Sequence, residues 1–223
     1  MLLVREAIME MDSDVSLAQF CQLVTAKIAE AYIRHGVGEG HLSTHPEDRL
    51  TASVCVFSLM RKEIWMIGDC QCLCNGILYE NPKPHERPVA EHRSAIIRRM
   101  ISSGTYTEEQ LTVHDYARDQ VVADIVESCH HQNKDFSVVD GFPIALDKTL
   151  RIDASDVREI VMSTDGYPFL KPTLAESEAA LAHQLSEDPL CYKSYLATKG
   201  RMQGNVSFDD RAYVRFLLKD ICQ

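Results

Sequence analysis

The sequence predicts an α+β domain with mostly antiparallel sheets. Two observations support this class. Short apolar runs are separated by turn signals, of which Asn75-Gly76 is the strongest, and longer segments with helical spacing lie between groups of such runs. The order along the chain is a helix, then hairpins, then helices, then hairpins, which is typical of α+β folds rather than of parallel βαβ sheets.

Residues 12–34 are expected to form the first helix, because apolar side chains recur there at helical spacing. The recurring positions are Leu17, Phe20, Cys21, Val24, Ile28 and Ala31. Asp12, Ser13 or Asp14 can cap its start. The glycines of residues 36–40 end it, and residues 41–49 are expected to form a polar loop.

A first group of strands follows this loop. Residues 51–60 are apolar on both faces, as a buried strand requires, and Arg61-Lys62 makes a tight turn into residues 64–67. Gly68-Asp69 bends the chain before residues 70–74, and Asn75-Gly76 predicts a hairpin to residues 77–79. We expect an antiparallel meander here.

The second half alternates loops, helices and short strands. Residues 80–88 are proline-rich and predict a loop. Pro172, Thr173 and Glu176 start a later helix, since Pro suits the first turn and the other two form a capping box. The predicted elements are helices at 88–102, 107–129, 172–185 and 189–199, strands at 136–139, 149–153, 158–164 and 212–218, and a polar loop at 200–204.

Length and charge limit the classes of function. The chain of 223 residues is 45% apolar, enough for the core of one domain spanning residues 1–223. Its net charge of −10 argues against a nucleic-acid partner, and the small basic group of Arg93, Arg98 and Arg99 is expected to be a solvated helix face. No apolar run is long enough to span a membrane and no signal peptide is recognisable, so we expect a cytoplasmic protein.

The cysteines and histidines do not form a recognisable metal-binding pattern. Cys70, Cys72 and Cys74 alternate along one strand and therefore share a face. A zinc site would need a second pair of ligands, so we interpret these three as small buried hydrophobic residues. His130-His131 and the other histidines show no ligand spacing.

Two acidic turns adjoin predicted strands. Asp165-Gly166 directly follows the apolar run 160–163, and Asp209-Asp210 directly precedes residues 212–218. A carboxylate at a strand end is fixed by the sheet but faces solvent, a suitable position for holding a hard cation. If the two strand ends meet, Asp165 and Asp209 are candidate metal ligands.

Four segments in this order resemble the metal-dependent protein phosphatase family, type 2C, in its shorter bacterial form. They are residues 51–57, 64–70, 160–166 and 209–214, with a further similar segment at 136–143. Cys70, Thr164 and Ala212 depart from the residues usual in these motifs. The resemblance covers about residues 15–220.

The resemblance implies two antiparallel sheets packed as a sandwich and flanked by helices. It also implies two Mg²⁺ or Mn²⁺ ions that activate water for hydrolysis of a serine or threonine phosphate ester. By residue match, Asp165 and Asp209 would bind metal, and Asp69 would have a structural role in its turn.

One part of the family pattern has no counterpart. Members carry a phosphate-binding Arg, an early Asp and a metal-bridging Asp-Gly ahead of the first long helix. Residues 2–11 contain Arg5, Glu6 and Glu10 but no Asp-Gly, and neither Asp12 nor Asp14 precedes a Gly. The domain is therefore expected to be N-terminally truncated, with an incomplete site that binds Mg²⁺ or Mn²⁺ weakly as a single ion.

Three hypotheses follow. The chain is a working phosphatase completed by nearby acidic residues or a partner chain, or it is a weak or inactive phosphatase-fold domain that regulates by binding a phosphoprotein or another regulatory protein. In the third, both acidic turns belong to an unrelated α+β domain, since Asp and Gly favour turns. Missing opening strands would leave a sheet edge exposed, which predicts homo-oligomers.

Overall fold

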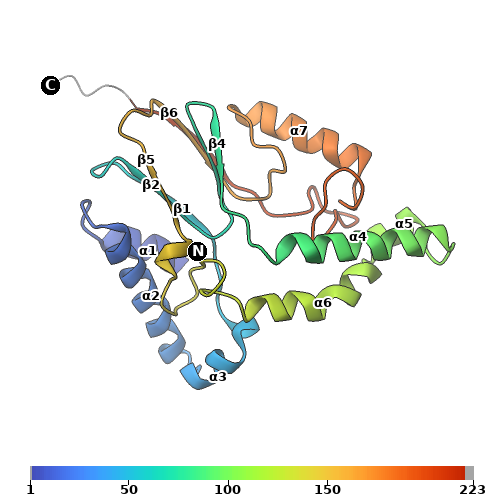
Figure 1. The fold of residues 1–223 in the computed structure, drawn as a ribbon, viewed down its shortest axis with the longest axis horizontal. Coiled ribbons are helices and arrows are strands. Elements are labelled where there is room, and N and C mark those ends of the chain that lie inside the picture. The colour runs from blue at the N-terminus through green and yellow to red at the C-terminus, as the bar shows by residue number, and fades with distance from the viewer. Residues whose placement is uncertain (1, 219–223) are drawn as a thin grey trace.

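The computed structural model describes residues 2–218, so the outermost residues of the predicted domain, 1 and 219–223, lie outside the described part. Two antiparallel sheets form its centre (Figure 1). The first sheet has the order β1 (Val54–Ser58), β2 (Glu63–Ile67), β5 (Leu150–Asp153). The second has the order β4 (Ile77–Glu80), β3 (Gln71–Cys74), β6 (Glu159–Ser163), β7 (Tyr213–Leu217). Every strand pair is antiparallel, which confirms the predicted class.

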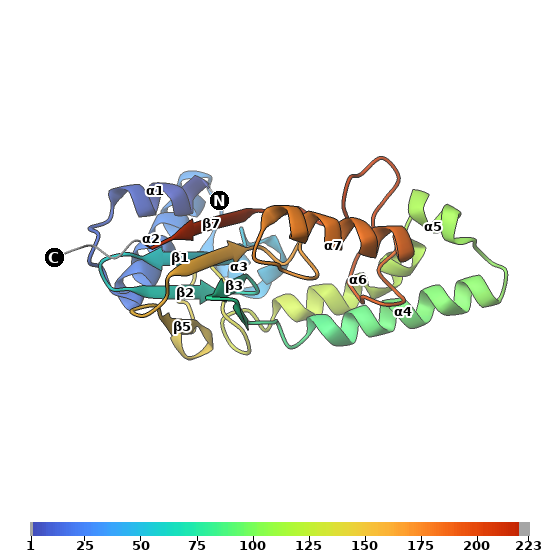
Figure 2. The same cartoon turned by 90° about the horizontal axis from the view of Figure 1, so that it is seen from above.

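Helices lie outside the two sheets and beyond one end of them. In Figure 1, α1 and α2 lie on the side of the first sheet and α7 on the side of the second. Figure 2 shows α4, α5 and α6 extending away from the strands. The helices are α1 (Leu2–Glu10), α2 (Leu17–Arg34), α3 (Glu39–Thr44), α4 (Glu86–Ser102), α5 (Glu108–Val113), α6 (Tyr116–Cys129) and α7 (Leu174–Glu187), with short 3₁₀ turns at Pro46–Asp48 and Leu146–Lys148.

The two sheets face each other across a hydrophobic core. Ile64 and Met66 of the first sheet and Cys72 and Ile160 of the second are fully buried in it. Cys70 and Cys74 are also buried there, which confirms that the three alternating cysteines are core residues. A sandwich of two sheets is the consequence of these apolar inner faces.

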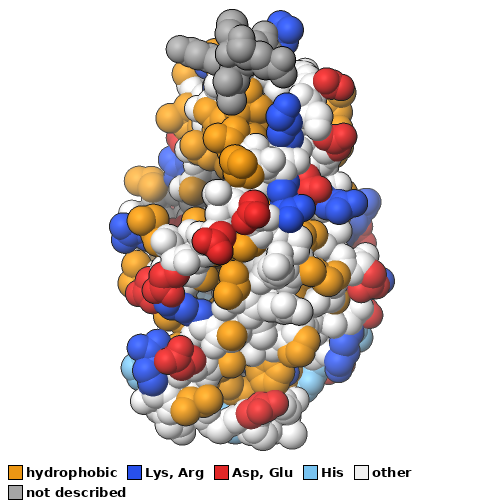
Figure 3. Space-filling model, turned by 90° about the vertical axis from the view of Figure 1, so that its left-hand side faces the viewer, with side chains coloured by type: hydrophobic (Ala, Val, Ile, Leu, Met, Phe, Trp, Pro, Cys, Tyr) orange, Lys and Arg blue, Asp and Glu red, His pale blue; other side chains and the backbone are white. Residues whose placement is uncertain are grey.

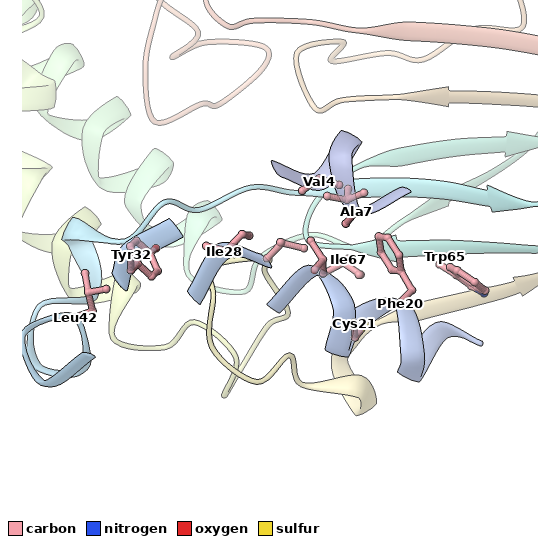
Figure 4. Close-up of a cluster of buried hydrophobic side chains, with 12 residues drawn as sticks. Val4, Ala7, Phe20, Cys21, Ile28, Tyr32, Leu42, Trp65 and Ile67 are labelled. Atoms are coloured by element: carbon pink, nitrogen blue, oxygen red, sulfur yellow. The ribbon is translucent and has the colours of Figure 1, made fainter. Parts of the chain in front are cut away.

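The outer face of the first sheet carries a second core. Phe20 of α2 lies against Trp65 of β2, with ring centroids 5.8 Å apart (Figure 4). Val4 and Ala7 of α1 join this cluster. Burial on both faces explains why residues 54–67 read as near-continuous apolar runs. On the second sheet, Leu73 and Val161 pack outward against Leu170, just ahead of α7.

The predicted meander is wrong at one point. β1 and β2 form one hairpin and β3 and β4 another, but these hairpins belong to different sheets. Gly68-Asp69 carries the chain from one sheet to the other. Gly68 has φ +83°, and a Cβ there would collide with the side chain of Ser53, so this crossing requires glycine. Asp69 is thereby placed at one end of the sandwich.

The N-terminal helix prediction also needs correction. The long helix starts at Leu17, where Ser16 and Gln19 form a capping box, rather than near residue 12. Residues 2–10 form a separate helix, and α3 lies within the predicted polar loop. Short helices are marginal alone and depend on tertiary contacts such as those of Val4 and Ala7, which sequence spacing does not reveal.

Three other elements differ from prediction. The helix expected at 107–129 breaks before Asp115, whose carboxylate accepts the backbone N–H of Arg118 and caps α6. Of the strand expected at 136–139, only two isolated bridges form, from Val139 to Ala52 and from Phe136 to Gln132. No helix forms at 189–199, because the chain wraps around the buried Asp188, which accepts the backbone N–H groups of residues 192–194. The remaining elements differ only at their ends.

The basic group on α4 is only partly the solvated face that we expected, because Arg98 and Arg99 are exposed but Arg93 is not. Arg93 is fully buried, and its guanidinium donates to Asp115 at 2.6 Å and to the carbonyl of Leu190 at 2.9 Å. Arg98 donates to the carbonyl of Tyr192 at 2.9 Å. These two arginines tie α4 to the segment before the final strand, so they are structural residues.

Apolar side chains are exposed at the edges of the second sheet. Within residues 2–218, β4 and β7 each pair with one neighbour only, and they expose Ile77, Leu78, Val214 and Leu217. Figure 3 shows hydrophobic side chains between charged ones over one side of the molecule. Association through an edge stays a prediction. Among the described residues, no helix is long and apolar enough to cross a membrane.

Candidate metal site

The strand register brings the predicted acidic turns to one end of the second sheet. β6 pairs with β7, and beyond the strands Thr164 and Ala212 continue the pairing through two hydrogen bonds of 3.1 and 3.2 Å. Asp165 and Asp209 therefore emerge at the same end. Gly166 is required for this approach, since a Cβ there would collide with the carbonyl oxygen of Asp210.

Asp69 reaches the same place by a second route. β3 pairs with β6 so that Gln71 lies opposite Ser163. Asp69, two residues before Gln71, is consequently opposite Asp165, two residues after Ser163. α4 begins nearby at Glu86 (Figure 1). Carboxylate oxygens of Asp69, Glu86 and Asp165 all lie within 4.8 Å of one another.

Neighbouring groups hold Asp69 firmly. Asp69 is only 8% exposed. The hydroxyl of Ser53 donates to one of its carboxylate oxygens, and the ammonium of Lys83 lies 2.5 Å from the other. Burial alone would raise the pKa of Asp69, but Lys83 and Ser53 outweigh it and the pKa is lowered. Asp69 is therefore the ionised member of the group over a wide pH range.

The other two carboxyl groups behave in the opposite way. Burial, followed by the negative charges of Asp69 and Asp209, raises the pKa of Asp165 to about 6. Burial, followed by the charge of Asp69, raises the pKa of Glu86 to about 7. Like charges crowded in a partly desolvated place resist ionisation together. This combination is the electrostatic signature of a site that a cation would stabilise.

Asp209 is close by but is held differently. It lines the same cavity as Asp165 and Glu86, yet it is outside the group whose oxygens lie within 4.8 Å. Lys199 donates to its carboxylate at 2.5 Å. Asp209 thus contributes negative potential at Asp165, while one of its own oxygens, Oδ1, is engaged by Lys199.

The acidic group opens into a cavity of about 420 Å³ between the sheet end and the segment before β7. This volume is within the range of small-molecule sites. The cavity contains cationic as well as anionic side chains, and Tyr195 and Phe208 form part of its wall. Its charged residues are Lys83, Glu86, Arg87, Asp165, Lys199 and Asp209.

The donor set fits one hard divalent cation. Mg²⁺ and Mn²⁺ favour oxygen ligands, and Asp69, Glu86 and Asp165 supply three convergent carboxylates. A second adjacent ion has fewer ligands, since Asp209 lies outside the convergent group and its Oδ1 is paired with Lys199. Lys83 already neutralises part of the charge on Asp69, so a cation at this place would bind weakly.

Part of this group of acidic side chains was predicted from the sequence. Asp165 and Asp209 meet at one strand end as expected, whereas their role as metal ligands stays a prediction. Asp69, predicted to be structural, lies within the carboxylate group. Glu86 was missed, because an acidic residue in the first turn of a helix is ordinary and gives no separate signal.

Comparison of the chain with protein-family models, with curated proteins and with solved structures gives no match in any of the three. The resemblance to the type 2C phosphatases therefore stays a prediction based on the sequence segments.

Proposed function

We propose that this chain is a domain of the metal-dependent protein phosphatase type that binds one Mg²⁺ or Mn²⁺ ion and a phosphorylated protein segment, with little hydrolytic activity. The observation that carries the proposal is the convergence of Asp69, Glu86 and Asp165 within 4.8 Å, with two pKa values raised. The carboxylates of such a group repel one another when they are ionised, and a bound cation offsets this repulsion.

Each side chain would have a distinct part. Asp165 and Glu86 would give up their protons to the solvent and present oxygens to the cation, while Asp69 would anchor it from the sheet end. A bound divalent cation supplies Lewis-acid activation of water and neutralises phosphoryl charge. Lys83 and Lys199 line the cavity and would attract a phosphate group.

The charge balance of the cavity supports this ligand class. One divalent cation together with the ammonium groups of Lys83 and Lys199 would offset the carboxylates of Asp69, Glu86, Asp165 and Asp209. The guanidinium of Arg87 would then leave a positive charge for a phosphate ester. The apolar wall formed by Tyr195 and Phe208 would accept the carbon part of such a ligand. The cavity is open to solvent at the protein surface, as a peptide ligand requires.

Little hydrolysis is expected because only one ion fits. Two adjacent ions hold the attacking and leaving oxygens together in two-metal hydrolases. In this chain the fourth carboxylate, Asp209, lies outside the convergent group and has one oxygen paired with Lys199, so a second position has at most one carboxylate of its own. The domain would retain a phosphorylated partner rather than turn it over.

The test is hydrolysis of p-nitrophenyl phosphate with Mn²⁺, run beside a phosphopeptide-binding assay. We expect Mn²⁺-dependent binding of a phosphoserine peptide library, little turnover, and loss of binding in Asp165→Asn. The conservative change removes one charge while preserving the shape of the side chain, and circular dichroism would verify folding.

A working phosphatase is the second candidate. The specific observation in its favour is Glu86, a carboxylate that the sequence motifs do not include and that joins Asp69 and Asp165. Sustained Mn²⁺-dependent turnover, abolished by both Asp165→Asn and Glu86→Gln, would support this candidate and refute the binding-domain proposal. Absence of both Mn²⁺ and phosphopeptide binding would refute both.

A further inference from the structure

A second group of potential metal ligands lies next to the carboxylate group but outside its cavity. His85 immediately precedes Glu86, and its Nε2 atom lies 2.9 Å from Oδ2 of Asp135. Nδ1 of His131 lies 2.7 Å from the same oxygen. One ligand atom from each of the three side chains lies within 4.8 Å of the others. The two imidazole rings face each other, with centroids 4.1 Å apart.

The fold rather than the local sequence creates this group. His85 is the residue before α4, whereas His131 and Asp135 belong to the loop after α6. Backbone hydrogen bonds from Asp135 and Lys134 to the carbonyl of His131, of 3.0 and 3.1 Å, close this loop into a compact turn. Spacing along the sequence does not indicate this group. His131 and Asp135 are four residues apart, and the third member comes from fifty residues earlier.

The donor atoms select a different class of metal from the carboxylate group. Two imidazole nitrogens and one carboxylate oxygen are the donors that Zn²⁺ and its late first-row neighbours favour, whereas Mg²⁺ binds oxygen. The free imidazole nitrogen of His131, Nε2, lies 3.8 Å from a carboxylate oxygen of Glu127. At this distance the two groups are not hydrogen-bonded, so Glu127 places a negative charge beside the ring without fixing its orientation.

The exposure of the three side chains allows a cation to enter. His85, His131 and Asp135 are between one third and one half exposed, so no buried charge has to be created before the metal arrives. Three protein ligands leave a fourth position of a tetrahedral ion to water. Each imidazole needs only to exchange its hydrogen bond with Asp135 for a bond to the same metal.

We propose that His85, His131 and Asp135 form a Zn²⁺-class site that joins the start of α4 to the loop after α6. The proposal does not rest on the proposed function, and its ligands are separate from those of the Mg²⁺ or Mn²⁺ position. Its structural effect is to fix the first turn of α4. Because Glu86 directly follows His85, a metal at this site also fixes the residue that extends the carboxylate group.

The test is calorimetric titration of the EDTA-treated, dialysed protein with Zn²⁺ in excess Mg²⁺. We expect one Zn²⁺ per chain at this site, a rise in the melting temperature with Zn²⁺, and affinity reduced at least about tenfold in His131→Ala. His92→Ala is the matched control. His92 is on α4 and makes a 2.8 Å contact with Asp124 of α6, but it has no second histidine.

A second variant separates ligand loss from misfolding. Asp135→Asn preserves the size of the side chain, and its Zn²⁺ affinity is also expected to fall, while Asp165→Asn leaves Zn²⁺ binding unchanged. The proposal is refuted if the wild-type protein does not bind Zn²⁺, or if His131→Ala and His92→Ala lose the same affinity. Loss of Zn²⁺ binding in Asp165→Asn would assign the metal to the carboxylate group instead and would equally refute it.

Discussion

The molecule contains two groups of charged side chains, one fully buried and one partly buried, that are built in opposite ways. In the first, the guanidinium of Arg93 is paired with Asp115 and also donates to the carbonyl oxygens of Leu190 and Ala197. In the second, Asp69, Glu86 and Asp165 crowd together with Lys83 as the close cationic partner of one of them.

The balance of charge in each group indicates whether the group has a structural role or is a candidate ligand-binding site. A buried charge with a counter-charge and satisfied hydrogen bonds stabilises one conformation. Removing either partner lowers the stability of the fold, because the other charge is left buried and unpaired. A group with surplus like charge weakens the fold near neutral pH, and its raised pKa values record that cost. Such a cost is expected where a ligand balances the charge.

The largest expected effect comes from breaking the balanced pair. Arg93→Ala should lower the free energy of unfolding by about 3–5 kcal/mol, because it leaves Asp115 buried without its cation. Urea denaturation followed by circular dichroism would measure this. Arg99→Ala is the control on the same helix, since Arg99 makes only a 3.5 Å exposed contact with Gln120. Equal effects of the two substitutions would show that Arg93 is not the structural centre we describe.

In the group of Asp69, Glu86 and Asp165 we expect the opposite effect: removing a charge should raise the free energy of unfolding. The folded-state pKa of Asp165 is about 6, above its usual 3.8, so its contribution to stability is fully present below pH 3.8 and lost as the pH rises through 6. Asp165→Asn should therefore stabilise the metal-free protein at pH 8 by about 1–3 kcal/mol. Urea denaturation in EDTA measures this, and destabilisation at pH 8 would contradict the electrostatic account.

Cation binding should depend on pH in the same range. Glu86 and Asp165 hold protons below pH values of about 7 and 6, and a cation has to displace them. Mn²⁺ affinity should rise at least about tenfold from pH 5.5 to pH 7.5. Calorimetry at several pH values would follow the change. Glu86→Gln is expected to flatten the upper part of the curve, and an unchanged curve would exclude Glu86 as a ligand.

A smaller effect is expected from releasing Asp209. Its ion pair with Lys199 is partly exposed and should contribute about 0.2–1 kcal/mol. Lys199→Gln frees the carboxylate to face the cation, so Mn²⁺ affinity should increase by up to about fivefold. The more exposed Lys193→Gln, which loses a contact to Glu108 away from the cavity, is the control. A decrease in Lys199→Gln would indicate that this lysine supports the site directly.

The sequence predicted the strand ends better than the side-chain partners. Asp165 and Asp209 were candidate ligands on the condition that their strand ends meet, and the register of β6 and β7 brings these ends together. The pairing of Asp209 with Lys199 depends on the path of residues 189–199, which were predicted to be a helix but form an irregular segment. Charge partners set by such loops have no periodic signal.

Residues brought together from distant elements were also missed. Glu86 and His85 are adjacent in sequence, yet each belongs to a different group of side chains formed with residues far along the chain. Arg93 appeared to be one of several surface arginines, and only its place between α4 and the 189–199 segment shows that it is buried. Local spacing does not encode contacts of this kind.

The central claim is that Asp69, Glu86 and Asp165 hold a single cation. Electron paramagnetic resonance counts bound Mn²⁺ directly, and the titration should be run on the wild-type protein and on Asp165→Asn at pH 7.5 with Zn²⁺ present to fill the histidine group. One Mn²⁺ ion per chain in the wild type and none in Asp165→Asn is the predicted result. No bound ion in the wild type, two coupled ions, or unchanged binding in Asp165→Asn would contradict the claim.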